Sequence, residues 1–143
     1  MLKIIKSWFI LLIMVREFKR LDVWKRAIVL GKRIYEVTKK FPDDEKYGLV
    51  SQLRRAVVGI SSNIAEGCGR RTDKDTIQFL YIAMGSVKEV QSQLYISKEF
   101  GYLSESLLKE LDDELEEISK MVMGFVNYIS KENKFHLVLG LIF

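Results

Sequence analysis

The sequence predicts an all-α protein, an antiparallel up-down-up-down four-helix bundle in residues 16–132. Only one of its 143 residues is proline, and turn clusters are scarce, which favours long helices over many short strands. Apolar residues recur at steps of three and four in four successive segments, as they do in amphipathic helices. The breaks between these segments are short, and short connections place neighbouring helices antiparallel.

The first helix is expected from about Asp22, a suitable N-cap, to Lys40. Phe41 precedes Pro42, and proline disfavours the helical conformation in the residue before it, so the helix should end there. The positions that follow the helical period are Trp24, Ala27, Ile28, Gly31, Ile34 and Thr38.

The second helix is expected to start between Asp44 and Leu49 and to end at Gly67–Gly69, where glycine can adopt the left-handed conformation. The third should begin near Thr72 or Asp73 and stop at Gly101. Their apolar stripes are Leu49, Leu53, Ala56, Val57, Ile60 and Ile64, and then Ile77, Leu80, Ala83, Met84, Val87, Val90 and Leu94.

Ser104 is expected to cap the fourth helix. The apolar positions after it alternate steps of three and four without interruption, which gives a seven-residue repeat. They are Leu108, Leu111, Leu115, Ile118, Val122, Phe125 and Ile129.

Both ends of the chain are apolar. Residues 1–15 form an N-terminal extension with an unbroken apolar run of eight from Trp8 to Val15, far short of the roughly 20 residues that span a bilayer. It can be a membrane-associating tail, an extra element packed on an oligomer, or an over-called start before a natural initiator at Met14, and the last interpretation is the most economical. Residues 133–143 form a similar C-terminal tail.

The chain has one histidine, His136, and one cysteine, Cys68. This composition leaves no cysteine and histidine cluster for a metal and little material for a nucleophile with its base. Arg70 and Arg71 follow Cys68 and can lower its pKa, but a spectator thiol is the simpler interpretation. We therefore expect no catalytic residue, no metal, no cofactor, no small-molecule substrate and no enzymatic activity.

One end of the chain is basic and the other acidic. Residues 16–40 hold nine Lys and Arg against three acids, a balance of +6, and residues 104–143 hold eight acids against four lysines, a balance of −4. Three pairs of cations recur every seven residues, so they form a basic stripe on one side of the first helix. This stripe can be a solvated face, a nucleic-acid contact, or the partner of acids on the fourth helix (Glu110, Asp113, Glu114 and Glu117). Its members are Lys25, Arg26, Lys32, Arg33, Lys39 and Lys40.

The second helix has an unusual polar face, with glycine, serine and amides where a solvated face would have Lys and Glu. Glycine inside a helix costs about 1 kcal/mol relative to alanine, and a closely approaching partner would offset that cost. The alternative is that Gly59, and Gly85 on the third helix, only allow tight packing inside the bundle. The residues expected at a subunit interface are Gln52, Arg55, Gly59, Ser62, Asn63 and Glu66, with Ser86 and Glu89 of the third helix.

Several short motifs, in order, resemble the four-helix bundle proteins that are encoded in intervening sequences of bacterial 23S rRNA genes. The resemblance covers about residues 16–131 and implies a homopentamer with no associated enzymatic reaction. It also extends to the accessory variability determinant of diversity-generating retroelements, a pentamer that binds a reverse transcriptase. The motifs are Leu21-Asp-Val-Trp24, Phe41-Pro42, Tyr47-Gly48-Leu49, Gln52-Leu-Arg-Arg-Ala56, Asn63-Ile-Ala-Glu-Gly67 and Gly85-Ser86 with Glu89.

These observations lead to two functional hypotheses. The first is a cytoplasmic, homo-oligomeric helical scaffold that binds structured RNA or DNA through the basic stripe. The second is a protein-interaction scaffold, for example an accessory subunit for a partner such as a reverse transcriptase, without direct contact to nucleic acid. The resemblance favours subunit packing as the role of the polar face.

Overall fold

Helices make up most of the chain in the computed structural model, which describes the backbone of residues 16–142 and the side chains as far as Lys131. Within this range the protein is a four-helix bundle without strands. Two 3-10 helices supplement the four long ones. In chain order the elements are η1 (Phe18–Arg20), α2 (Asp22–Thr38), η2 (Asp43–Glu45), α3 (Leu49–Cys68), α4 (Asp73–Glu99) and α5 (Glu105–Ile142).

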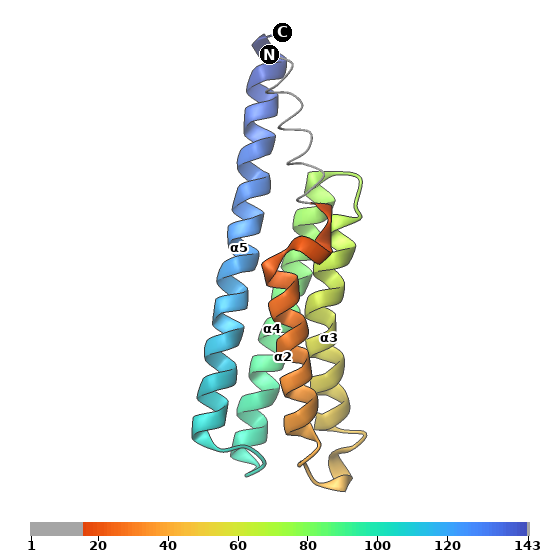
Figure 1. The fold of residues 1–143 in the computed structure, drawn as a ribbon, viewed down its shortest axis with the longest axis vertical. Helices are drawn as coiled ribbons and strands as arrows, with labels where there is room; N and C mark the ends of the chain where they lie inside the picture. Colours follow the sequence, from red (N-terminus) through yellow and green to blue (C-terminus); the bar gives the residue numbers. More distant parts are fainter. Residues whose placement is uncertain (1–15, 143) are drawn as a thin grey trace.

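Each long helix packs against two others (Figure 1). Helix α3 lies between α2 and α4, and α5 contacts α4 and α2. The 3-10 helix η1 crosses the end of the bundle at which the α3–α4 connection also lies. Two outer surfaces therefore involve α3: one shared with α4 and one shared with α2.

The helix ends follow from local hydrogen bonding. Thr72 caps α4, because its hydroxyl accepts a hydrogen bond from the amide of Asp75 at 3.1 Å. Ser104 does the same for α5, accepting from the amide of Leu107 at 3.2 Å. Gly101, just past α4, has a φ of +82°, the left-handed region that glycine adopts without strain. The predicted starts of α4 and α5 and the predicted end of α4 at Gly101 are confirmed. The left-handed conformation expected at the end of α3 is not found: Gly69 has a φ of −83°, and among the described residues Gly101 is the glycine with a positive φ.

The core is one continuous cluster to which all four helices contribute. Side chains such as Leu53, Leu80 and Leu115 are completely buried. Full burial of a leucine side chain contributes about 1.5–3 kcal/mol, so the periodic apolar stripes account for the bundle. The stripes predicted for α3, α4 and α5 lie largely in this core.

Helix α2 departs from its prediction in two respects. Its N-cap is Leu21, and Asp22 is the first helical residue, where its carboxylate faces the positive end of the helix dipole. Its buried side carries Val23 and Leu30, whereas Ile28, which was expected there, is 46% exposed. The apolar residues of α2 fit two overlapping stripes, and contact with α3 and α5 selects one of them.

Helix α5 continues to Ile142, through the segment that the sequence pattern set apart as a tail. It extends beyond the ends of the other three helices (Figure 1). The predictions for residues 1–15 lie outside the described residues.

Candidate interaction surfaces

The outer sides of α3 and α4 form a surface that has few charged side chains around its centre. A groove of about 590 Å³ runs between the two helices. Six of the eight predicted interface residues line it, together with Ala56, which was predicted in the core stripe, and Val58, which the sequence did not single out. The lining residues are Gln52, Arg55, Ala56, Val58, Gly59, Ser62, Ser86 and Glu89.

Gly59 marks a close approach of the two helices. A Cβ at this position would lie 3.1 Å from the hydroxyl oxygen of Ser86. The side-chain amide of Asn63 donates to the backbone carbonyl of Gly59 at 2.7 Å. Gly59 therefore has a packing role within the chain, whereas a Cβ at Gly85 would meet nothing within 4 Å.

A buried amide lies beside the groove. Gln93 is 5% exposed, and its Nε2 donates to Gln52 at 3.4 Å and to Glu89 at 3.2 Å. Its Oε1 has no hydrogen-bond partner among the described residues. Gln93 follows Ser86 and Glu89 at steps of three and four, so the three side chains lie on one stripe of α4 and the spacing could have identified it.

Apolar side chains border the same surface. Val58 of α3 is 46% exposed and Ile82 of α4 is 43% exposed. Between Leu49 and Gly67, α3 has one acidic residue, Glu66. Glu66 lies toward the end of the helix, where it pairs with Arg70, so it is engaged away from the groove.

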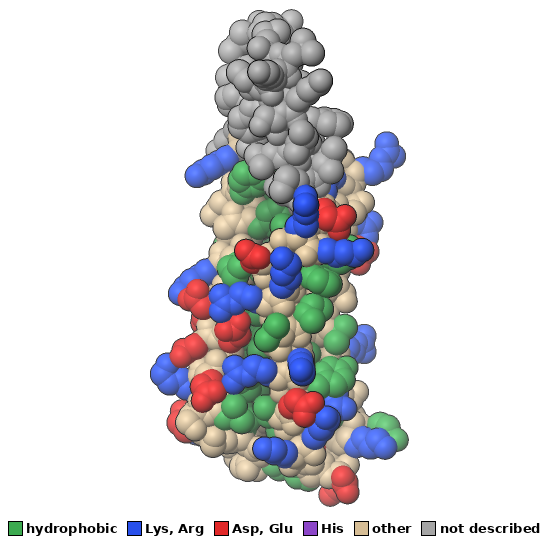
Figure 2. All heavy atoms as spheres, viewed as in Figure 1, with side chains coloured by type: hydrophobic (Ala, Val, Ile, Leu, Met, Phe, Trp, Pro, Cys, Tyr) green, Lys and Arg blue, Asp and Glu red, His purple; other side chains and the backbone are tan. Residues whose placement is uncertain are grey.

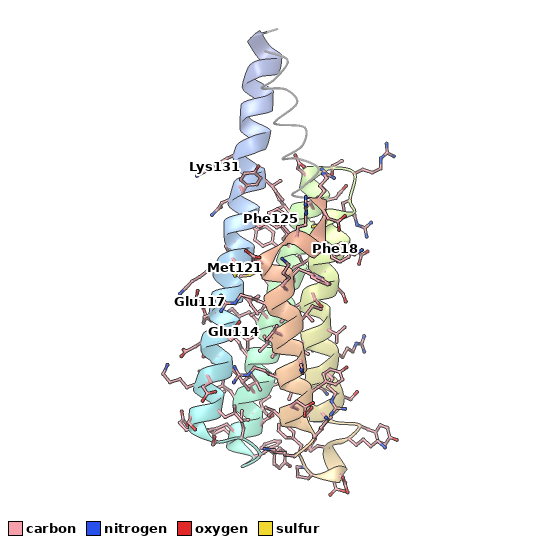
Figure 3. All side chains as sticks on the ribbon, in the orientation of Figure 1. Phe18, Glu114, Glu117, Met121, Phe125 and Lys131 are labelled. Atoms are coloured by element: carbon pink, nitrogen blue, oxygen red, sulfur yellow. The ribbon has the colours of Figure 1, made fainter. Side chains whose placement is uncertain are left out.

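The basic stripe of α2 is partly neutralised by α5. Arg26 makes two hydrogen bonds to the carboxylate of Glu114, both 2.9 Å long, and Arg33 pairs with Glu110 at 2.9 Å. Glu114 and Met121 lie on the side of α5 that faces α2 (Figure 3). The hydrogen bond and charge of Glu114 raise the pKa of Arg26 further. The pairing of α2 with acids of α5, one of the alternatives that the sequence left open, is thus confirmed for Arg26 and Arg33.

The other two acids of that set bind lysines of their own helix. Asp113 pairs with Lys109 at 2.6 Å, and Glu117 pairs with Lys120 at 2.7 Å. Hydrogen bonding to Lys120 is the main reason that the pKa of Glu117 is lowered. These ion pairs are exposed, and such pairs contribute at most about 1 kcal/mol each.

The four lysines of the stripe face outward. Lys25 lies 3.7 Å from Asp22, and Lys39 lies 2.8 Å from Glu36. Lys32 and Lys40 have no ion-pair partner within 4 Å among residues 16–131. The stripe therefore divides into two arginines bound to α5 and four lysines exposed to solvent.

The described residues contain no arrangement that suggests catalysis. Cys68 is buried, and desolvation raises the pKa of its thiol to about 11, so the neighbouring arginines do not activate it. Residues 16–131 hold no group of three or more His, Cys, Asp or Glu side chains that could bind a metal. No helix in the described part of the chain is long and apolar enough to cross a bilayer.

The fold defines a four-helix bundle, and its described surface includes a groove between α3 and α4 and a basic stripe on α2. The family model described as "23S rRNA-intervening sequence protein" matches residues 19–124. The chain belongs to this family.

A solved structure has the same fold. It is a protein of unknown function from the S23 ribosomal protein family of Bacteroides thetaiotaomicron. The two chains are 20% identical and superpose with a TM-score of 0.65, over 73% of this chain and 97% of the other. A comparison with curated proteins found no match.

Proposed function

We propose that this protein is a non-enzymatic scaffold, an antiparallel bundle that assembles with copies of itself through the face formed by α3 and α4. A homopentamer is the expected assembly. The antiparallel arrangement is supported by the pairing of α2 with α5, because Arg26 contacts Glu114 while Arg33, further along α2, contacts the earlier Glu110.

The observation that carries this proposal is the composition of the α3–α4 face. Its groove is lined by one amide, two hydroxyls, three small or apolar residues and one ion of each sign, Arg55 and Glu89. Exposed Val58 and Ile82 add apolar area next to it. Protein interfaces are depleted of charge at their centres, whereas the outer side of α5 carries closely spaced ion pairs that suit solvent.

A second observation is the energetic cost of Gly85. Glycine within a helix is less favourable than alanine by about 1 kcal/mol, and nothing in this chain occupies the space that its missing Cβ leaves. Close approach of another molecule is a reason for glycine at such a position. Because Gly31 and Gly124 are equally open, what distinguishes Gly85 is its place next to Ser86, which lines the groove. Gly85 follows Ile82 by three residues, so both are on the outer face of α4.

Mass measurement in solution tests the proposal. Native mass spectrometry and light scattering should give a multiple of the chain mass, with five copies expected. Gly85→Lys should reduce the assembly to smaller species without unfolding, because a side chain there has free space in the monomer.

Gly124→Lys on α5 is the matched control, because a Cβ at Gly124 also meets nothing within 4 Å. This variant should assemble normally. A monomeric wild type would refute the proposal, and equal loss of assembly in both variants would refute the assignment of the face.

Contact with nucleic acid through the basic stripe is a second candidate, supported by the four lysines that face outward. It is the weaker candidate because Arg26 and Arg33 are engaged by carboxylates. Titration with 23S rRNA fragments at several salt concentrations tests it. Phosphate contacts predict affinity that falls steeply with salt and with Lys32→Glu, and binding insensitive to both would exclude it.

A further inference from the structure

The outer surface shared by α2 and α3 combines exposed apolar side chains with cations. Ile28 and Tyr35 of α2 are 46% and 39% exposed, and Val58 of α3 is 46% exposed. The guanidinium of Arg54 connects the two helices, since it lies 4.7 Å from the ring centroid of Tyr35 and donates to the hydroxyl of Thr38 at 3.0 Å. We call this surface the α2–α3 seam. Figure 2 shows apolar and basic side chains predominating over the middle of the two helices.

The charge of the seam is mostly positive. Lys25, Lys32 and Lys39 follow one another at seven-residue steps along α2, next to the line of Ile28 and Tyr35. The hydrogen-bond partners of Arg54 are a hydroxyl and a carbonyl, which leave its charge uncompensated. Two acids lie among these groups: Asp22 is 3.7 Å from Lys25, and Glu36 is 2.8 Å from Lys39. The pKa of Glu36 is lowered by Lys39 first and by Lys32 and Arg54 as well.

The seam has room for a closely packed partner. Gly31 lies between Ile28 and Tyr35 on α2, and a Cβ there would meet nothing within 4 Å. The interval from Lys25 to Lys39 is 14 residues, or about 21 Å at 1.5 Å per residue. Within this interval, Ile28 and Tyr35 are seven residues, or about 10 Å, apart. A row of cations with apolar side chains along its middle matches a helix of about four turns that carries an apolar edge at its centre and carboxylates on its flanks.

We propose that the α2–α3 seam docks an acidic amphipathic helix of a partner protein, with the helix's apolar edge on Ile28 and Tyr35 and its carboxylates toward Lys32 and Arg54. This inference goes beyond self-assembly, which uses the α3–α4 face. The acidic helix α5 of a second copy is a poor occupant. Between Glu105 and Lys131, α5 has no large hydrophobic side chain among the exposed ones, so it would leave the apolar strip uncovered.

Nucleic acid fits the seam less well than an acidic helix. Aromatic rings that serve as base-stacking platforms must offer a free face, and the guanidinium of Arg54 covers one face of Tyr35. Ile28 and Val58 would also interrupt a row of phosphate contacts. An amphipathic helix uses both the apolar and the charged groups.

The test measures fluorescence anisotropy of a labelled 18-residue peptide with leucines at helical spacing and glutamates on both flanks. Three further probes are the same peptide with lysines for glutamates, the same peptide with serines for leucines, and an 18-nucleotide single-stranded RNA. We expect the acidic amphipathic peptide to bind most tightly and the other three to bind at least about tenfold more weakly.

Two substitutions on α2 test whether the peptide binds at the seam. Gly31→Glu adds a carboxylate where there is free space and should weaken binding at least about tenfold; Gly124→Glu on α5 is its matched control. Ile28→Ser should weaken binding about fivefold or more, whereas Val29→Ser, about 100° further around the helix, should not. Light scattering on each variant separates loss of peptide binding from loss of self-assembly.

Each contrary result overturns the proposal in a definite way. Equal binding of the lysine peptide would remove the electrostatic argument, and equal binding of the serine peptide would remove the apolar one. Tighter binding of the RNA, weakened by Gly31→Glu but not by Ile28→Ser, would assign the surface to nucleic acid. Absence of binding by all four probes would refute docking at the seam.

Discussion

Gly67 permits the closest approach between the end of α3 and the start of α4. A Cβ at Gly67 would lie 3.1 Å from the Cβ of Phe79 and 3.2 Å from the carbonyl oxygen of Thr76. Neither of these atoms can move without moving the backbone of α4. Overpacking of this kind costs about 1–3 kcal/mol, so Gly67→Ala should destabilise the fold. The gain from helix propensity will be small because Gly67 is one residue from the end of α3.

Gly124→Ala is the appropriate reference, since it makes the same chemical change within α5 where nothing lies within 4 Å of the new Cβ. It should raise the free energy of unfolding by about 1 kcal/mol, the full difference in helix propensity. The two variants should therefore differ by about 2–4 kcal/mol, which follows from adding this gain to the overpacking cost.

Thermal unfolding followed by circular dichroism measures this difference. At roughly 4 °C per kcal/mol for a chain of this size, Gly67→Ala should melt about 8 °C or more below Gly124→Ala. Protein concentration must be the same for both, because the proposed self-assembly would shift the midpoint. A melting temperature for Gly67→Ala equal to or above that of Gly124→Ala would refute the close contact between α3 and α4.

Three further predictions concern other parts of the bundle. Ser119→Ala should raise the free energy of unfolding by about 1 kcal/mol in urea titrations, because the buried Ser119 hydroxyl has no hydrogen-bond partner among the described residues. A lower free energy of unfolding would contradict this, because it would mean that the hydroxyl makes a stabilising hydrogen bond. A thiol reagent at pH 8 should modify folded Cys68 far more slowly than the unfolded chain. The free energy of unfolding should also decrease from pH 9 toward pH 11, because the Cys68 thiol loses its proton at a lower pH in the unfolded chain than in the folded one. Cys68→Ala should remove that part of the decrease. A double-mutant cycle on Arg26 and Glu114 should give a coupling of about 1 kcal/mol that decreases with salt; a larger, salt-independent value would contradict the partial exposure of the pair.

The sequence predicts the helices well because their ends have local causes. Thr72, Ser104 and Gly101 act through neighbouring backbone groups, so one chain segment contains the whole explanation. The orientation of α2 about its own axis was harder to predict, because its apolar residues fit two stripes. Contact with α3 and α5 decides between them, and it leaves Ile28 exposed and Leu30 buried.

The candidate interaction surfaces were predictable only in part, because contacts between distant parts of the chain also shape them. Spacing placed Gln52, Arg55 and Ser86 on common faces, and they do line one groove. It could not determine that Arg26 reaches Glu114, which is 88 residues away. The contact between Arg54 and Tyr35 likewise depends on how α2 and α3 lie against each other.

Helix α3 contributes to both proposed surfaces, and Val58 borders each of them. Arg54 and Arg55 are adjacent in sequence, yet the first reaches across to α2 and the second lines the groove with α4. A change in the packing of this one helix would therefore be felt on both sides. If partner binding and self-assembly are linked through α3, the linkage is reciprocal. A partner that shifts the protein toward the assembled form must then bind the assembled form more tightly than the monomer. Raising the protein concentration, which favours assembly, would in turn increase the affinity for that partner.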